Sequence, residues 1–303
     1  MSIGVCEPSL SELLALRARA QALAAGARRR SADRAAGSRH SPFRGRGMDY
    51  AESRAYASGD DVRHVDWRLT ARAGKLHTKL FAAERERTSA VLLDTSISLR
   101  FGTRQGFKSV QAARLAALFL WFAQSEGDRV TAAAFGAVSG QLPAQGTHRG
   151  VLRALSEVEH WSRVSPQGGP ALPLSAAADR MGRVLQGGGH ILLLLDCASL
   201  DAEALRALAR LRRDHDLAAL VLADPLEREP LPPGRYRIET PRGLAELHSD
   251  GRLAPWQTAL RERQQQAVDA LRRIGAGVRI ASTREDPVRS LQDLLRGRPQ
   301  EAA

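Results

Sequence analysis

The sequence predicts an α/β protein with a doubly wound, mostly parallel sheet, preceded by an N-terminal helical and β-rich extension. From residue 88 onward, short apolar runs typical of buried strands alternate with longer segments typical of helices. Two of these runs, within residues 88–94 and 190–196, end in an aspartate. If both strands are parallel, their carboxyl ends share one edge of the sheet, and that edge is acidic.

The chain is organised around residues 88–98. An apolar run ends in Asp94, and hydroxyls follow at Ser96 and Ser98. In open α/β sheets the carboxyl ends of the strands open onto the crevice that holds ligands. One carboxylate and two hydroxyl oxygens suit Mg²⁺ or Mn²⁺. The same residues also fit a strand-to-loop turn, in which Asp and Ser cap nearby backbone groups.

The composition is that of a globular protein. The chain has 303 residues, of which 43% are hydrophobic and 26% are charged, and this is enough for a full core. The longest apolar runs, such as 118–122 and 191–195, are too short to span a bilayer, and we expect no secretory signal. Cys6 and Cys197 are the only cysteines. They exclude a disulfide framework and indicate a cytoplasmic location.

Positive charge is concentrated near the N-terminus. The formal net charge is +12, and residues 1–47 carry nine arginines against three acidic residues. Such a basic arm fits nucleic acid or an anionic surface, or a solvated and partly mobile segment. Because Phe43 is the only Phe, Trp or Tyr among the arginines, the pattern favours the solvated arm. Within the arm we expect a helix over 8–27 and a loop over 31–47.

Residues 48–87 combine acids, arginines and aromatics at close spacing. Tyr, Trp and Arg are the usual anchors of protein interfaces, so this stretch is a candidate interaction surface. It also fits a structural carboxylate–guanidinium network, or acid–base work by one of its aspartates. The alternation at its end predicts a strand over 75–81. The candidate interaction residues are Arg54, Tyr56, Asp60, Asp61, Arg63, Asp66, Trp67 and Arg72.

The remaining segments alternate in type. Residues 226–250, punctuated by proline and glycine, indicate an antiparallel hairpin. No glycine-rich motif joins a strand to a helix, so no nucleotide loop is predicted. We expect helices over 104–126, 147–161, 171–186, 201–213, 252–274 and 285–296, and strands over 130–135, 190–196, 217–222 and 278–280.

Asp196 follows its strand as Asp94 follows its own, 102 residues earlier. If the two tips meet, Asp94, Ser96, Ser98 and Asp196 form a candidate metal site. No serine or cysteine lies beside a plausible His–acid pair, so the sequence predicts no nucleophilic site.

These motifs together resemble the bacterial domain of unknown function 58 family, from about residue 40 to the end of the chain. The matching motifs are, in order, Arg54-x-Tyr56-x-x-Gly59-Asp60-Asp61-x-Arg63-x-x-Asp66-Trp67, Thr70-Ala71-Arg72, Asp94-x-Ser96-x-Ser98, Phe101-Gly102, Gly127-Asp128-Arg129-Val130 and Asp224-Pro225-x-Glu227.

The resemblance implies a von Willebrand factor type A-like domain, which often carries a metal-ion-dependent adhesion site. Asp94, Ser96 and Ser98 match the first loop of such a site, and Asp196 matches the third. The second loop departs from the pattern: Pro170 stands where related sequences have the threonine ligand, and proline has no side-chain oxygen. Ser165 and Ser175 are candidate replacements for the missing ligand.

The expected organisation is a basic helical arm (1–47), a family-signature extension (48–87) and a von Willebrand factor A-like domain (88–303). Our leading hypothesis is a non-enzymatic protein-interaction module that binds an acidic residue of a partner through Mg²⁺ or Mn²⁺, or directly. The resemblance implies work with a MoxR-type AAA+ ATPase in the assembly or maturation of other proteins. The rival hypotheses are a metal-assisted hydrolase with a base from residues 60–66, and nucleic-acid binding through the arm.

Overall fold

The chain divides into a larger and a smaller compact unit in a computed structural model. The larger unit comprises Met1–Arg44 and Arg87–Ala303, and the smaller comprises Gly45–Glu86. The structure describes residues 6–34, 50–57, 65–81, 87–103, 105–163, 171–185, 188–240 and 243–297.

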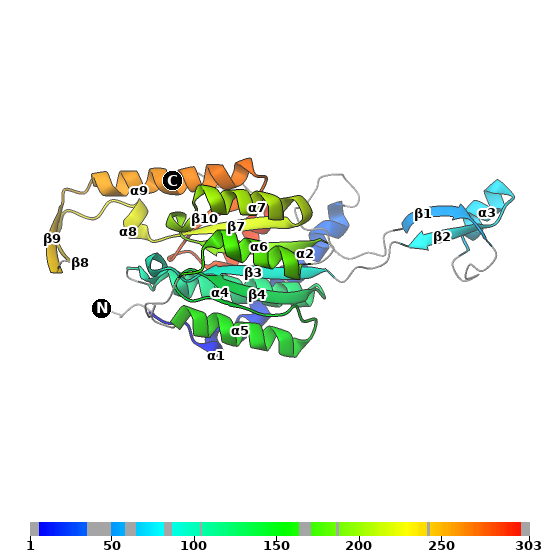
Figure 1. Ribbon diagram of the computed structural model, residues 1–303, viewed down its shortest axis with the longest axis horizontal. Coiled ribbons are helices and arrows are strands. Elements are labelled where there is room, and N and C mark those ends of the chain that lie inside the picture. The colour runs from blue at the N-terminus through cyan, green and yellow to red at the C-terminus, as the bar shows by residue number, and fades with distance from the viewer. Residues whose placement is uncertain are drawn as a thin grey trace. The chain divides into compact units, whose positions relative to one another are not determined.

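A six-stranded sheet forms the centre of the larger unit, in the order β10-β7-β6-β3-β4-β5 (Figure 1). All neighbouring strands are parallel except the short edge strand β5, which runs antiparallel to β4. Counted along the chain, this is the 3-2-1-4-5-6 order of doubly wound sheets, so the predicted fold class is confirmed. The strands are β3 (Thr88–Asp94), β4 (Arg129–Phe135), β5 (Gly140–Gln141), β6 (Gly189–Leu195), β7 (Asp216–Ala223) and β10 (Gly277–Ser282).

Helices cover both faces of the sheet (Figure 1). In β3, Val91 and Leu93 belong to the core on one face, while Ala90 and Leu92 belong to the core on the other. The side chains that point to either face of the sheet are apolar, because helices cover both faces and neither meets water. One face carries α1 (Leu10–Ala15), α2 (Arg17–Arg34), α4 (Lys108–Ser125), α5 (His148–Arg163) and α10 (Pro287–Arg296), and the other carries α6 (Leu174–Val184), α7 (Ala202–Asp214) and α9 (Pro255–Arg273).

Helix α4 is apolar nearly all round because helices as well as the sheet pack against it. Helices α1 and α2 contribute Leu13 and Leu23 to the same core. The indole N–H of Trp121 donates to the Leu13 carbonyl at 3.1 Å, and the guanidinium of Arg17 lies over the Trp121 ring. The described N-terminal helices are therefore part of the larger unit and not a separate solvated arm.

Several element boundaries differ from the sequence predictions. The helix expected over 8–27 is interrupted at Leu16 and resumes as α2, which continues to Arg34. The first residues of the loop expected over 31–47 are therefore helical, and its other residues lie outside the described part of the chain. The short elements β5 and α8 (Pro225–Arg228) were not predicted. The hairpin expected within 226–250 is present as β8 (Gly234–Thr240) and β9 (Gly243–Ser249).

The smaller unit pairs β1 (Tyr50–Ala55) antiparallel with β2 (His77–Phe81), which confirms the strand expected near 75–81. Helix α3 (Trp67–Ala73) lies between them in sequence. Asp66 caps this helix, because its carboxylate accepts the Leu69 N–H at 3.1 Å. Neither β1 nor α3 was predicted.

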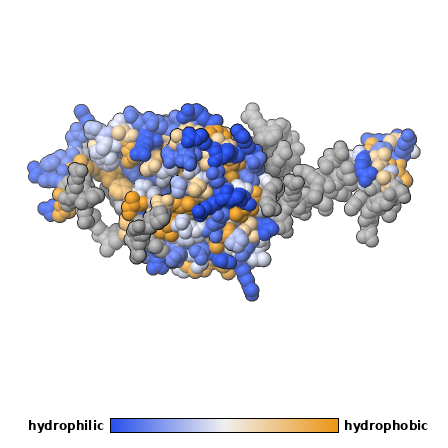
Figure 2. Space-filling model, viewed as in Figure 1, coloured by the Kyte–Doolittle hydropathy of each residue, from blue (hydrophilic) through white to orange (hydrophobic). Residues whose placement is uncertain are grey.

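The surface of the larger unit is mixed in polarity. Figure 2 shows hydrophilic side chains over much of the visible face, with apolar side chains between them. Within the described part of the chain, no helix has both the length and the apolar character that a bilayer crossing requires.

Candidate functional site

The tips of β3 and β6 meet where the strand order reverses. These two strands are hydrogen-bonded neighbours, and the chain leaves them toward opposite sides of the sheet. Asp94 is the last residue of β3 and Asp196 directly follows β6. The backbone N–H of Asp196 donates to Asp94 Oδ2 at 3.0 Å. The structure therefore brings both predicted acids to the ligand-binding edge of a doubly wound sheet.

The Asp94 carboxylate is used internally. It is 2% exposed. Its Oδ1 accepts the Ser96 N–H at 2.8 Å, and its Oδ2 also accepts the Ser199 hydroxyl at 2.5 Å. Burial raises the pKa of Asp94, while these hydrogen bonds oppose the rise. Asp94 thus holds the two strand-to-loop turns together and does not face a partner.

The hydroxyls beside it are more accessible. Ser96 Oγ and Ser98 Oγ lie 2.9 Å apart, and both residues are half-buried. They belong to the loop that leads from β3 into the 3₁₀ helix η2 (Ile97–Arg100). On the same loop Ile97 is 69% exposed and Phe101 is 38% exposed. The open part of this edge is therefore a pair of hydroxyls flanked by two apolar side chains.

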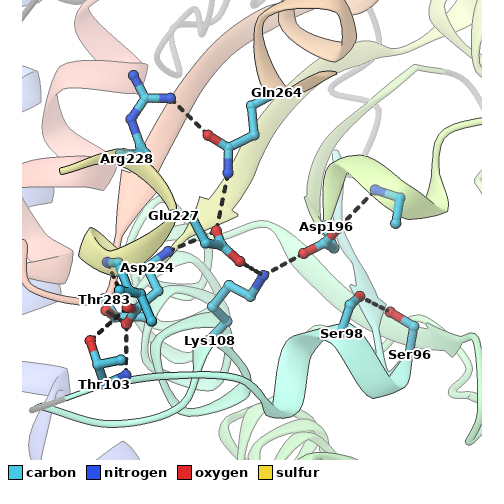
Figure 3. Close-up of polar contacts among 12 residues, drawn as sticks. Ser96, Ser98, Thr103, Lys108, Asp196, Asp224, Glu227, Arg228, Gln264 and Thr283 are labelled. Carbon is cyan, nitrogen blue, oxygen red and sulfur yellow. Dashed lines mark hydrogen bonds and ion pairs between the residues drawn. The ribbon is translucent and has the colours of Figure 1, made fainter. Parts of the chain in front are cut away.

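Asp196 binds a buried lysine that the sequence analysis did not consider. Its Oδ1 accepts the Ala198 N–H at 2.8 Å, and its Oδ2 accepts the ammonium of Lys108 at 2.5 Å. The Lys108 ammonium also donates to Glu227 Oε1 at 2.6 Å (Figure 3). Burial alone would lower the pKa of Lys108, but the two carboxylates outweigh burial and the pKa is raised. Lys108 is therefore a charged ammonium between two carboxylates.

A second layer of hydrogen bonds holds Glu227 and its neighbour Asp224. Glu227 Oε2 accepts the Asp224 N–H and the Gln264 amide, both at 3.0 Å. The Asp224 carboxylate accepts the hydroxyls of Thr103 at 2.6 Å and Thr283 at 2.8 Å. Figure 3 shows this chain of contacts running from Asp196 through Lys108 to Thr283. It joins the ends of β6, β7 and β10 to the start of α4.

One signal for Lys108 was available in the sequence. It is one of three lysines among 45 Lys and Arg residues, and the other two lie in the smaller unit. Arginine would not fit in its place, because a planar guanidinium is larger than the compact ammonium that two carboxylates enclose here. Ser199 carried no comparable signal, because its partner Asp94 lies 105 residues away.

The described residues do not fit a divalent cation in the arrangement that they adopt. A lysine ammonium already binds Asp196, and N–H and O–H donors use both oxygens of Asp94. Among the residues that the structure describes, no group of three His, Cys, Asp or Glu side chains is placed to hold a metal. Ser175 is buried in α6, and Ser165 and Pro170 lie outside the described residues. Metal binding stays a prediction that these contacts do not favour.

The described residues near the site include no activated nucleophile. Cys197 follows Asp196, and burial raises the pKa of its thiol to about 12. A thiol that stays protonated at neutral pH is a poor nucleophile. Cys197 therefore lacks the activation that a nucleophilic thiol needs.

The candidate interaction residues of the smaller unit fall into two groups. Trp67 is 68% exposed, and Arg54 and Arg72 are exposed as well. Tyr56 and Asp66 are half-buried, and Asp66 accepts the Ser53 hydroxyl at 3.3 Å besides capping α3. Asp60, Asp61 and Arg63 lie outside the described residues. The exposed members present one indole and two guanidinium groups to solvent.

The fold and this edge define a doubly wound α/β domain whose switch point is filled by a buried ion-pair network. The chain belongs to the family described as "Protein of unknown function DUF58", whose profile matches residues 52–272. The predicted family is thereby confirmed.

Relatives of similar sequence occur in mycobacteria. The uncharacterized protein Rv1480 of Mycobacterium tuberculosis and the uncharacterized protein Mb1516 of Mycobacterium bovis are each 30% identical to this chain over 190 residues. The match covers 61% of this chain and 58% of each relative. The match therefore spans less than two thirds of the relatives' length.

Solved structures of similar shape include two bacterial proteins. One is the conserved hypothetical protein BatB from Bacteroides thetaiotaomicron, with 14% identity and a TM-score of 0.46, over 69% of this chain and 97% of that one. The other is a von Willebrand factor type A protein from Catenulispora acidiphila, with 15% identity and a TM-score of 0.41, over 72% of this chain and 42% of that one.

Proposed function

We propose that this protein is a non-enzymatic, von Willebrand factor A-like interaction module that binds a partner protein at the carboxyl edge of β3 and β6. We further propose that it works in the cytoplasm with a MoxR-type AAA+ ATPase in the assembly or maturation of other proteins. Family membership and the resemblance of the motifs support the ATPase. Cys6 and Cys197, the two cysteines of the chain, are not joined in a disulfide, which suits a reducing compartment.

The loop from Ser96 to Phe101 carries the proposal. An exposed Ile97 and a partly exposed Phe101 flank the hydroxyls of Ser96 and Ser98 on a loop that a rigid sheet positions. Exposed apolar side chains beside hydrogen-bonding groups are typical of protein-binding sites. The acids beneath this loop are buried and paired, so the surface offers contacts and no reactive group.

The side chains of the loop indicate what kind of partner surface it can bind. The hydroxyls of Ser96 and Ser98 donate hydrogen bonds to carboxylate or carbonyl oxygens. Ile97 and Phe101 need an apolar surface to cover them. We therefore expect the partner to present an oxygen acceptor beside an apolar patch.

The smaller unit supplies a second surface in this proposal. Trp67, Arg54 and Arg72 are exposed, and tryptophan and arginine are frequent hot spots of interfaces. Two exposed arginines and an exposed indole in one unit suit an acidic partner segment. Replacing Trp67 with alanine tests this surface independently of the sheet edge.

A binding measurement tests the proposal. The full chain is immobilised and a purified MoxR-type ATPase from the same genome is titrated over it. We expect Ile97→Asp to weaken binding by about tenfold or more, because a charge replaces the central apolar contact. Leu244→Asp is the matched control, since Leu244 is 77% exposed on β9 and lies outside the loop. Equal affinity of the wild type and both variants would exclude the edge as the binding site.

A further inference from the structure

The position of Lys108 bears on what holds the carboxyl edge together. Lys108 begins α4, is 2% exposed, and is among the largest fully buried side chains of the described residues. Its ammonium reaches Asp196, which follows β6, and Glu227, which lies in α8. One side chain thus ties three elements together at the point where the strand order reverses.

The contacts of Lys108 are those of a small cation enclosed by carboxylates. An ammonium is a compact point charge, whereas a guanidinium is a wide planar fork. The two carboxylate oxygens lie 2.5 and 2.6 Å from Nζ. The ring of Phe101 lies over the same ammonium, with its centroid 5.8 Å from Nζ. Phe101 is partly exposed, so it connects the buried cation to the proposed binding loop.

A divalent ion bound here would meet an existing positive charge. It would have to share Asp196 with Lys108 or displace the ammonium from both carboxylates. On Asp94 it would have to share Oδ1 with the Ser96 N–H, or replace the Ser199 hydroxyl and the Asp196 N–H on Oδ2. Apart from these paired carboxylates, what remains are two neutral serine oxygens, which are too few for Mg²⁺ or Mn²⁺.

We infer that Lys108 is the resident cation of this edge and that partner binding there requires no divalent metal. The ammonium supplies the positive charge that keeps Asp196 and Glu227 in place, so the loop from Ser96 to Phe101 is positioned without a metal. The first half of this inference, that Lys108 is the resident cation, concerns only this chain. The second half, that partner binding requires no divalent metal, rests on the proposed function.

Manganese titration tests the first half without any partner. MnCl₂ is added to the full-length wild type, Lys108→Met and Lys75→Met, and free Mn²⁺ is followed by electron paramagnetic resonance. We expect the wild type and Lys75→Met to show no saturable site tighter than about 1 mM, the weak end of protein sites for hard cations. We expect Lys108→Met to gain a site at least about tenfold tighter, because two carboxylates lose their cation.

Each result decides the question. A saturable site in the wild type that Ser98→Ala removes would overturn the inference, as would a folded Lys108→Met that gains no affinity. Should Lys108→Met fail to fold, Lys108→Gln takes its place, with circular dichroism as the check. If neither variant folds, the wild-type titration decides alone: the absence of a saturable site supports the inference, and a site that Ser98→Ala removes overturns it.

The second half is measured with the partner assay in EDTA and in MgCl₂. Equal affinity in both buffers supports metal-independent binding, and loss of affinity in EDTA overturns it. If no partner binds in either buffer, only the proposed function fails, because the Mn²⁺ titration stands by itself.

Discussion

The two ends of the central sheet bury ionisable groups in opposite ways. At the carboxyl end, Lys108 is charged and is enclosed by Asp196 and Glu227. At the amino end, His190 near the start of β6 is buried and neutral, since burial and the nearby positive charge of Arg87 lower its pKa to about 3. A buried charge is tolerated when opposite charges enclose it, and otherwise the group gives up its charge.

The neighbours explain the difference. Lys108 Nζ has two carboxylate oxygens within 2.6 Å. His190 has an arginine nitrogen 3.2 Å from its Nε2, which is a charge of the same sign as a protonated imidazole. The Asp216 carboxylate is 3.4 Å from Nδ1 but is half-exposed, so water weakens its attraction. The first site stabilises a cation and the second disfavours one.

The largest expected effect comes from removing the ammonium. Lys108→Met leaves two buried carboxylates without their cation, and we expect the free energy of unfolding to fall by about 3–5 kcal/mol. Urea denaturation of the full chain measures the change. Lys75→Met, at an exposed position of the smaller unit, should change it by less than about 0.5 kcal/mol. A loss below about 1 kcal/mol for Lys108→Met would mean that the ion pairs contribute little.

The amino end should respond to pH. The unfolded chain protonates His190 below a pKa of about 6.5, whereas the folded chain resists protonation down to about 3. The stability linked to His190 is therefore complete above pH 6.5 and is lost progressively as the pH falls toward 3. We expect a loss of up to about 3 kcal/mol between pH 7 and pH 4.

Urea midpoints at several pH values test this, as the difference between the wild type and His190→Gln. The variant should have a flatter stability profile between pH 6.5 and pH 4. His248→Gln, at an exposed histidine, should keep the wild-type profile. Parallel profiles for the wild type and His190→Gln would show that folding does not lower the pKa of His190.

A smaller effect should come from the outer layer of the Lys108 network. Thr283→Val keeps the side-chain shape but removes the hydroxyl that donates to Asp224 Oδ2 at 2.8 Å. The bond goes to a buried carboxylate, so we expect a loss of about 2 kcal/mol in the free energy of unfolding. Thr258→Val is the control, because the exposed Thr258 makes only a 3.5 Å contact. Similar losses for both variants would show that the hydrogen bond from Thr283 to Asp224 stabilises the fold no more than an exposed contact does.

The smallest effect on stability should come from the exposed loop. Ile97→Asp changes a side chain that is mostly in solvent, so we expect the free energy of unfolding to shift by less than about 0.5 kcal/mol. The same variant should weaken partner binding as proposed above. A large loss of stability would show instead that Ile97 is part of the core.

Local sequence predicted the sheet well and the smaller unit poorly. In the runs that form β3 and β6, consecutive residues are apolar, because each strand is covered on both faces of the sheet. Helix α3 and strand β1 gave no such pattern. They are short, and none of the residues of α3 is buried. Only the pairing of β1 with β2, across more than twenty residues, shows that Tyr50–Ala55 is a strand.

The candidate site was predicted in part for the same reason. Aspartates directly after two parallel strands had to share an edge, so Asp94 and Asp196 could be placed together from their positions alone. Their partners could not, because the Lys108 ammonium joins carboxylates that lie 88 and 119 residues away in the chain. Asp196 was therefore assigned to a candidate metal site from the sequence, whereas in the structure its carboxylate binds the Lys108 ammonium.

By itself, the order of apolar runs along this chain determined the doubly wound class and the edge at which the acids gather, because buried strands alternating with helices leave a recognisable pattern in the sequence. The family was indicated separately, by the resemblance of the polar motifs. Tertiary structure alone decided that these acids are enclosed and that an ammonium balances two of them. Electrostatic compensation depends on distances of a few ångströms between residues far apart in the chain, and such distances leave no local pattern.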